Sequence, residues 1–425
     1  MLNGRKLINT LRSSFKTSEV FYVVTSQILF VMLSFVLVKI LTNNLSISNY
    51  GYLALILTLI SFFTQVFLGG INASFSRYYS ISISNVNIKG YANSLRKLIK
   101  YLVSILFLII LVLFVIENIS YSLDLKIFMY AVAFAITAGY SSILNQILNI
   151  AKKRASSSIS LVLETSLKIF IILMLIGYYE LSVDLIIISF LISSLVALMI
   201  QHIFVTDLLS ANDNSGNNYD CFTDIIKYAV PYIPWTFIIW LQQISDKWFL
   251  EIYTSRDDVG GFALLFQIGF VPIIFLFTTL NRLISPVIYN NDTLNSSNIN
   301  TIIYNYIIYA AFGFGLILVY LSWNYSVDII LLFSHPKFLS YASFLHLFIL
   351  SGILFGLSEI FLLKMQSKMK VRLLNYVKSI LGLFGITINF IGVYFYGFVG
   401  LVYSLVIFSL INLISMYYYS FSYER

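Results

Sequence analysis

Apolar segments long enough to cross a bilayer, separated by short polar ones, dominate this 425-residue sequence. They stay apolar throughout, as in LVSILFLIILVLFVI at 102–116, whereas the strands of a membrane β-barrel alternate in polarity. A transmembrane helix needs about 20 mainly apolar residues and satisfies its own backbone hydrogen bonds in lipid. The pattern therefore predicts an all-α membrane protein with about twelve transmembrane helices, at 20–41, 50–70, 100–116, 125–149, 156–177, 184–205, 226–250, 259–282, 301–321, 339–362, 373–395 and 398–420.

One polar segment, SANDNSGNNYD at 210–220, divides these helices six and six. Its Asn, Ser and Gly content is typical of a flexible linker. We therefore predict an N-terminal six-helix lobe at 1–209, a cytoplasmic linker at 210–221 and a C-terminal six-helix lobe at 222–425. The run at 20–41 is too long for a signal-peptide core and is interpreted as a retained first helix. The short run at 327–333 cannot cross and is expected at the interface.

Composition agrees with the membrane assignment. The chain is 59% hydrophobic and 10% charged, with a mean hydropathy of +0.90, whereas soluble domains carry roughly 25% charged residues. The net charge of +8 does not indicate nucleic-acid binding, because the basic residues lie in the short gaps between apolar runs. Cys221, the single cysteine, cannot form an internal disulfide.

The distribution of Lys and Arg predicts the orientation, because cytoplasmic loops of membrane proteins are enriched in these residues. With the N-terminus inside, only Lys126, Arg256 and Lys337 fall in outer loops, and Lys39, Lys168 and Lys247 fall within helices. Both termini are therefore expected in the cytoplasm. The remaining 20 of the 26 basic residues then lie on the cytoplasmic side: Arg5, Lys6, Arg12, Lys16, Arg77, Lys89, Arg96, Lys97, Lys100, Lys152, Lys153, Arg154, Lys227, Arg282, Lys364, Lys368, Lys370, Arg372, Lys378 and Arg425.

An even number of helices in each half makes any internal repeat a parallel one, with its pseudo-two-fold axis along the membrane normal. A weak similarity fits this arrangement: YGYLAL opens the second predicted helix at 50–55, and GGFALL opens the eighth at 260–265. Two such lobes facing each other predict a cleft at the midplane, where alternating-access transporters bind cargo.

The sequence contains no recognisable catalytic constellation. His202, His335 and His346 are isolated, and no HExxH, cysteine pair or carboxylate cluster suggests a metal site. Neither nucleotide-binding glycine motif is present, nor a cytosolic domain to house one. We therefore predict a protein that is not an enzyme, binds no metal, and needs a gradient or a downhill substrate to drive transport.

Ionisable residues inside the predicted spans are the candidate functional residues, because charges in lipid are costly and usually functional or paired. Glu164 and Lys168 lie four apart near the middle of the fifth helix and share one face. Two interpretations stay open. The pair neutralises itself between packed helices, or Lys168 attracts an anionic cargo in a cleft while Glu164 keeps it charged.

The seventh helix is unusually polar, with Asp246 and Lys247 one turn after Gln242 and Gln243. These residues either tie helices together or take part in transport. Lys39, near the outer end of the first helix, either snorkels to the headgroups or faces cargo. Snorkelling or topology is the favoured account of Arg77, Arg282, Glu359 and Lys378, which lie near cytoplasmic helix ends.

Two regions resemble the polysaccharide flippases, the Wzx-type translocases of O-antigen and capsule repeat units, within the multidrug/oligosaccharidyl-lipid/polysaccharide exporter superfamily. The first, at 41–79, has Tyr-Gly after the first helix and a Gly-rich close of the second helix followed by Arg77. The second and more specific, at 227–272, has Pro-x-x-Pro opening the seventh helix, the Asp246–Lys247 pair, and VGGFA at 259–263 entering the eighth.

The resemblance implies a MATE-like inverted V of two six-helix lobes, with a central cavity lined largely by the first and seventh helices. It implies an undecaprenyl-diphosphate-linked oligosaccharide as cargo, moved to the periplasmic leaflet of the bacterial inner membrane. A polysaccharide polymerase and a chain-length regulator are implied as partners. No cofactor is implied, although some members use proton or sodium coupling.

Residue roles follow from this cargo. A diphosphate crossing lipid must exchange water for fixed cations, and Lys168, Lys247 and Lys39 are the candidates, in this order. Asp246 is the candidate coupling site, and Glu164 the charge partner of Lys168. The first helix has few cations for this family. Two alternatives remain: a multidrug or peptidoglycan-precursor exporter of the same superfamily, and a polytopic O-antigen polymerase or ligase, which typically needs a larger outer loop than 322–338.

Overall fold

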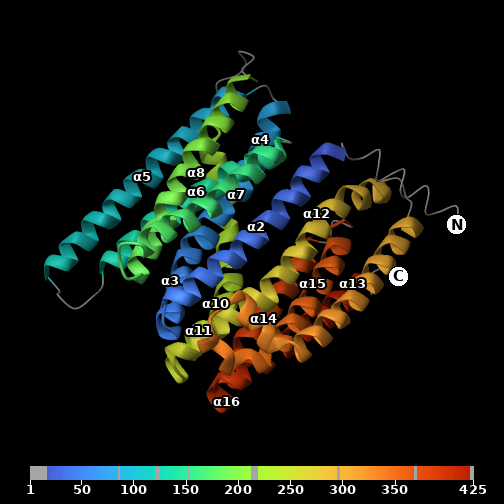
Figure 1. Cartoon of the computed structure of the whole chain (residues 1–425). Helices are drawn as coiled ribbons and strands as arrows, with labels where there is room; N and C mark the ends of the chain where they lie inside the picture. Colours follow the sequence, from blue (N-terminus) through green and yellow to red (C-terminus); the bar gives the residue numbers. More distant parts are fainter. Residues whose placement is uncertain are drawn as a thin grey trace. The chain divides into compact units, whose positions relative to one another are not determined.

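The computed structural model describes residues 17–84, 87–119, 125–151, 153–211, 219–293, 297–367 and 371–421. Every regular element in these ranges is helical, and Figure 1 traces the helices along the chain. Of the basic residues used to predict orientation, those outside the described ranges are Arg5, Lys6, Arg12, Lys16, Lys152, Lys368, Lys370 and Arg425.

The helices follow one another with short connections. Before the polar segment they are α2 (Thr17–Asn44), α3 (Ile47–Phe62), the π-helical η1 (Phe63–Phe67), α4 (Leu68–Ser84), α5 (Ile88–Ile119), α6 (Leu125–Ile150), α7 (Arg154–Ile176) and α8 (Val183–Ala211). After it they are α9 (Phe222–Ala229), the 3-10 helix η2 (Val230–Tyr232), α10 (Ile233–Tyr253), α11 (Arg256–Leu265), the π-helical η3 (Phe266–Phe270), α12 (Val271–Thr293), α13 (Ser297–Asn324), α14 (Ser326–Phe333), the 3-10 helix η4 (Pro336–Phe344), α15 (Leu345–Ser367) and α16 (Val371–Phe421).

The twelve predicted spans lie within these helices, apart from Gly177 at the end of the fifth span, which confirms the predicted all-α membrane fold. The second span is longer than predicted, because α3, η1 and α4 continue without a break to Ser84. The run at 327–333 forms α14, which at eight residues is too short to cross a bilayer.

The last two predicted spans both lie in α16, which reverses direction at Gly397. This residue has a φ of 59°, a left-handed conformation that favours glycine. Close packing follows on both sides of the turn: the Ser404 hydroxyl donates to the Ile388 carbonyl at 3.0 Å. A Cβ on Gly400 would lie 2.0 Å from the Gly392 carbonyl oxygen. The label α16 therefore covers a helical hairpin.

By length and composition, nine helical segments of the described ranges could cross a membrane, and one of them, Leu373–Ser420, contains both arms of α16. The predicted spans in α5 and α10 are not among the nine. In α10 the polar side chains of Gln242, Gln243, Asp246 and Lys247 lower the mean hydropathy.

Contacts group the chain into two compact units. Unit 1 comprises Met1–Val20, Val38–Gly51 and Leu241–Arg425, and unit 2 comprises Phe21–Leu37 and Tyr52–Trp240. The end of α2 and the start of α3 thus pack with the second half of the sequence. The predicted lobe boundary at 210–221 stays a prediction, and its residues 212–218 lie outside the described ranges.

Each unit has its own apolar core. In unit 2, Phe75, Tyr91, Ile143 and Leu144 are fully buried where α4, α5 and α6 meet, and the Tyr91 hydroxyl donates to the Phe75 carbonyl at 3.1 Å. In unit 1, the buried side chains of α12 and α15 form one cluster, and those of α15 and α16 form another. These cores fix the helix faces that carry the polar residues described next.

Candidate functional site

Glu164 and Lys168 form an ion pair within unit 2. They lie one turn apart on α7, and Lys168 Nζ donates to Glu164 Oε1 at 2.6 Å. The ammonium also lies over two aromatic rings, 5.5 Å from the centroid of Phe134 on α6 and 5.2 Å from that of Phe190 on α8. The side chains are only 17% and 13% exposed. The charge of Lys168 is therefore compensated by a carboxylate and two ring faces.

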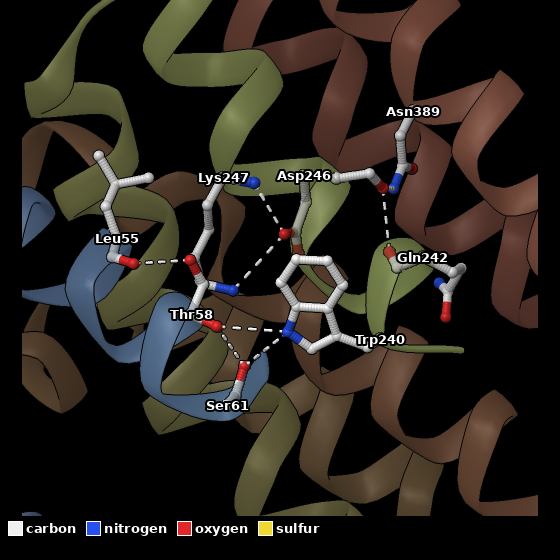
Figure 2. A network of polar contacts seen from close by, with 9 residues as sticks. Leu55, Thr58, Ser61, Trp240, Gln242, Asp246, Lys247 and Asn389 are labelled. Atoms are coloured by element: carbon white, nitrogen blue, oxygen red, sulfur yellow. Dashed lines mark hydrogen bonds and ion pairs between the residues drawn. The ribbon is translucent and has the colours of Figure 1, made fainter. Parts of the chain in front are cut away.

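Asp246 and Lys247 on α10 are also close, but their contact is longer (Figure 2). Lys247 Nζ lies 3.5 Å from Asp246 Oδ1, and the same oxygen accepts the Lys247 backbone N–H at 2.7 Å. The ammonium lies over the rings of Phe262 and Phe266, at 5.7 and 5.2 Å from their centroids. Asp246 is 6% exposed, so its carboxylate is buried beside a loosely held cation.

A buried amide adjoins this pair. Asn389 on α16 donates to the Ser245 hydroxyl at 3.2 Å, and Ser245 donates to the Gln242 carbonyl at 2.9 Å (Figure 2). Hydrogen bonding of buried polar groups is the general rule, because an unpaired one is costly. An amide of α16 and a hydroxyl of α10, 144 residues apart in sequence, are thus brought together at the residue before Asp246.

Lys39 caps a helix of unit 1. Its ammonium donates to the carbonyls of Leu331 and Ser334, at 2.6 and 2.5 Å, at the C-terminal end of α14. Cations are favourable there, since the helix dipole places partial negative charge at that end. A second contact runs in the opposite direction: Lys337 of η4 donates to the Leu45 carbonyl just after α2. The two lysines hold the α2–α3 connection against the segment from α14 to η4.

The predicted site residues are divided between the two units. Glu164 and Lys168 belong to unit 2, whereas Lys39, Asp246 and Lys247 belong to unit 1. Each of the three candidate lysines has a carboxylate or carbonyl partner. No group of three potential metal-ligating side chains occurs in the described part of the chain.

Two further polar contacts were missed from the sequence. Lys378 donates to Glu359 Oε1 at 2.9 Å, so these residues pair with each other where snorkelling was expected. The Arg77 guanidinium donates to the Tyr228 hydroxyl at 3.1 Å and lies 4.9 Å from the centroid of that ring. No sequence spacing indicates either contact, because the partners lie on different helices. Asn389 could have been found as an isolated amide in an apolar run.

Solved structures share this fold. An inward-facing multidrug resistance MATE family transporter of the MOP superfamily superposes with a TM-score of 0.71, at 16% identity over 93% of each chain. The lipid II flippase MurJ, in an inward closed conformation, gives 0.70 at 16% identity, over 94% of this chain and 87% of that one. A mutant of the Vibrio cholerae MATE transporter VcmN gives 0.66 at 14% identity over 97% of each.

Sequence comparison identifies the family. No curated protein sequence matches the chain. The model of the family described as polysaccharide biosynthesis protein matches residues 17–292, which is more than half of the chain. The protein therefore belongs to the polysaccharide biosynthesis protein family and is a multi-pass membrane protein with the fold of MATE transporters and MurJ.

Proposed function

We propose that this protein is a flippase that moves an undecaprenyl-diphosphate-linked oligosaccharide repeat unit from the cytoplasmic to the periplasmic leaflet of a bacterial inner membrane. The product would be O-antigen or another surface polysaccharide, assembled with a polymerase and a chain-length regulator. One observation carries the proposal: a chain of a polysaccharide biosynthesis family has the fold of a lipid II flippase. Alternating access is the mechanism that this fold class suggests.

The cargo diphosphate needs a cation that can leave its present partner. Lys168 is 2.6 Å from its carboxylate and Lys378 is 2.9 Å from its own, whereas Lys247 is 3.5 Å from Asp246. A longer contact is weaker, so releasing Lys247 costs least. We therefore place Lys247 before Lys168 as the cargo cation. Lys39 is not placed among the cargo cations, because its ammonium caps the C-terminal end of α14.

Asp246 is the proposed site for a coupling proton or sodium ion. If Lys247 turns to a diphosphate, a buried carboxylate is left without its counter-charge, which is costly unless a cation replaces it. Ser245 precedes Asp246 in sequence, and its hydroxyl and the Asn389 amide bonded to it carry oxygen atoms suited to Na⁺. Asp246→Asn is expected to change the pH or sodium dependence of transport, and an unchanged dependence would exclude this role.

A multidrug exporter is the second candidate, because two matching structures are multidrug resistance MATE family transporters. The polymerase or ligase reading finds no support among the matched structures described above, which are transporters and a flippase.

The test is transport by the purified full-length protein in liposomes. The probe is undecaprenyl diphosphate carrying a labelled repeat unit, and its arrival in the opposite leaflet is read by an impermeant glycan-cleaving enzyme. Lys247→Gln should slow transport about 10- to 100-fold, the loss expected for one charged hydrogen bond. Lys100→Gln removes an exposed lysine of α5 and should have no effect. Export of lipophilic cations without movement of the lipid would favour the multidrug reading.

A further inference from the structure

Helix α6 of unit 2 exposes only polar side chains over its second half. From Gly139 to Asn149, the exposed residues are Ser142, Gln146 and Asn149, and Asn145 is partly exposed on the same side. At a rise of 1.5 Å per residue, Ser142 lies about 12 Å from the helix end at Ile150. A helix that belongs to a membrane span thus presents amides and a hydroxyl well inside its length.

Neighbouring helices of unit 2 expose the opposite kind of surface. Apart from Ser104, the exposed side chains in 103–108 of α5, 170–174 of α7 and 192–203 of α8 are large and apolar, as expected against lipid. They include Val103, Phe107, Leu108, Phe170, Leu173, Met174, Ile192, Leu195, Met199 and Ile203. Because lipid cannot hydrogen-bond to amide side chains, the exposed strip of α6 must meet water or a polar ligand.

Helix α4 extends this polar strip. Asn72 on α4 donates to the Ser142 hydroxyl at 3.1 Å, which brings the polar edges of α4 and α6 together. The amide oxygens of Asn72 and Asn145 are shielded from solvent and have no hydrogen-bond partner among the described residues. Shielded acceptors of this kind are rare, and these two amides can satisfy theirs on a ligand hydroxyl only by turning outward.

The chemistry of this strip selects the ligand. No Asp, Glu, Lys, Arg or His occurs in 69–76 of α4 or in 137–149 of α6, and the first charge is Arg77. Amides and hydroxyls both donate and accept, which matches sugar hydroxyl and acetamido groups. The strip offers no fixed charge to hold a diphosphate or a drug cation.

We propose that this polar face, formed by Asn72, Ser142, Asn145, Gln146 and Asn149, binds the uncharged glycan of the cargo. The inference rests on the proposed flippase function and assigns the sugar part of the substrate to unit 2. The diphosphate is left to a cation elsewhere in the chain.

Two probes and matched variants test the proposal in proteoliposomes. One probe is undecaprenyl diphosphate carrying the full repeat unit, and the other carries a single N-acetylhexosamine. Ser142→Leu and Gln146→Leu should each slow transport of the full repeat unit about 10-fold, which is the effect of one or two lost hydrogen bonds. The same variants should slow transport of the single-sugar lipid less than about 2-fold. Ser104→Leu, the same change at an exposed serine of α5, should affect neither probe.

Thiol labelling gives a second measurement that does not depend on transport. In a Cys221→Ser background, an impermeant maleimide should label the Gln146→Cys variant. The full repeat-unit lipid should slow that labelling at least about 5-fold, because a glycan hydrogen-bonded to the polar face would cover the thiol. Equal slowing of both probes by the leucine variants, or slowing of neither, would overturn the glycan assignment. If the wild type moves neither probe, the proposed function fails. Labelling then decides alone: protection supports the polar face as a glycan site, and unchanged labelling rejects it.

Discussion

Glu164 and Lys168 show how a charge is kept inside this membrane protein. Their spacing of four residues predicted a shared helix face, and the ion pair at 2.6 Å confirms that they meet. The rings of Phe134 and Phe190 add cation–π contacts that no spacing could indicate, because they come from two other helices. The pair is therefore a packed unit of three helices.

This arrangement predicts the cost of removing one partner. Lys168→Met leaves the Glu164 carboxylate buried and unpaired, which should lower the free energy of unfolding by roughly 3–5 kcal/mol. The double variant Glu164→Gln/Lys168→Met removes both charges and should recover most of that loss. Thermal unfolding of the detergent-solubilised protein measures both. A double variant as unstable as the single one would show that the unpaired Glu164 carboxylate is not the cause of the lost stability.

Asp220 makes stability depend on pH. The Lys97 ammonium beside it lowers the pKa of its carboxyl, helped by the Phe222 backbone N–H and the Ser94 hydroxyl and opposed by desolvation. The pKa of Asp220 is therefore lower in the folded protein than in the unfolded chain. The ionised carboxylate stabilises the fold fully above about pH 4, and this stabilisation is lost as the pH falls through the folded-state pKa.

Asp220→Asn should therefore lower the unfolding temperature at pH 7, and the gap to wild type should close as the pH falls below about 4. Asp207→Asn, at an exposed aspartate of α8, is the control and should behave like wild type at every pH. If the difference in unfolding temperature between Asp220→Asn and wild type stays constant with pH, Asp220 stabilises the fold without its charge.

Helices α3 and α11 carry the weak internal repeat of the sequence. Both run into a π-helical segment, η1 and η3, and both have a glycine in the first two turns that touches the other helix. A Cβ on Gly51 would lie 2.2 Å from the Arg256 carbonyl oxygen, and one on Gly260 would lie 2.3 Å from that of Ile47. The Tyr-Gly and Val-Gly motifs are therefore explained by backbone contact between helix starts within unit 1.

Glycine substitutions test this contact. Gly260→Ala forces the helix starts apart and should destabilise the protein by about 1–3 kcal/mol, as overpacking does. Gly313→Ala on α13 is the matched control, because nothing lies within 4 Å of its Cβ position. It should be neutral or slightly stabilising, since alanine is the better helix former. The comparison is made by thermal unfolding, and equal effects of the two changes would rule out the close approach as the cause.

At the scale of the whole molecule, the sequence predicted the helices well and their contacts poorly. Apolar runs of about 20 residues are imposed by bilayer thickness, so each span could be read locally. The partners of Lys39 are 292 and 295 residues away, and Lys378 pairs with Glu359 on another helix. Such contacts depend on tertiary packing, which a single sequence does not encode locally. The polar face of α4 and α6 was missed for the same reason, since exposure follows from packing.

The orientation in the membrane is the remaining prediction at this scale. An even number of spans puts both termini on one side, and the bias of 20 basic residues to three places that side in the cytoplasm. Cysteine labelling of intact cells tests it in a Cys221→Ser background. Glu180→Cys, in the exposed α7–α8 connection, should react with an impermeant maleimide in intact cells. Lys153→Cys, exposed just before α7, should react only after permeabilisation.

Because one helix separates the two positions, they must lie on opposite sides if α7 spans the bilayer. Labelling of both in intact cells would therefore contradict the span, and the reverse pattern would contradict the orientation and the proposed direction of transport.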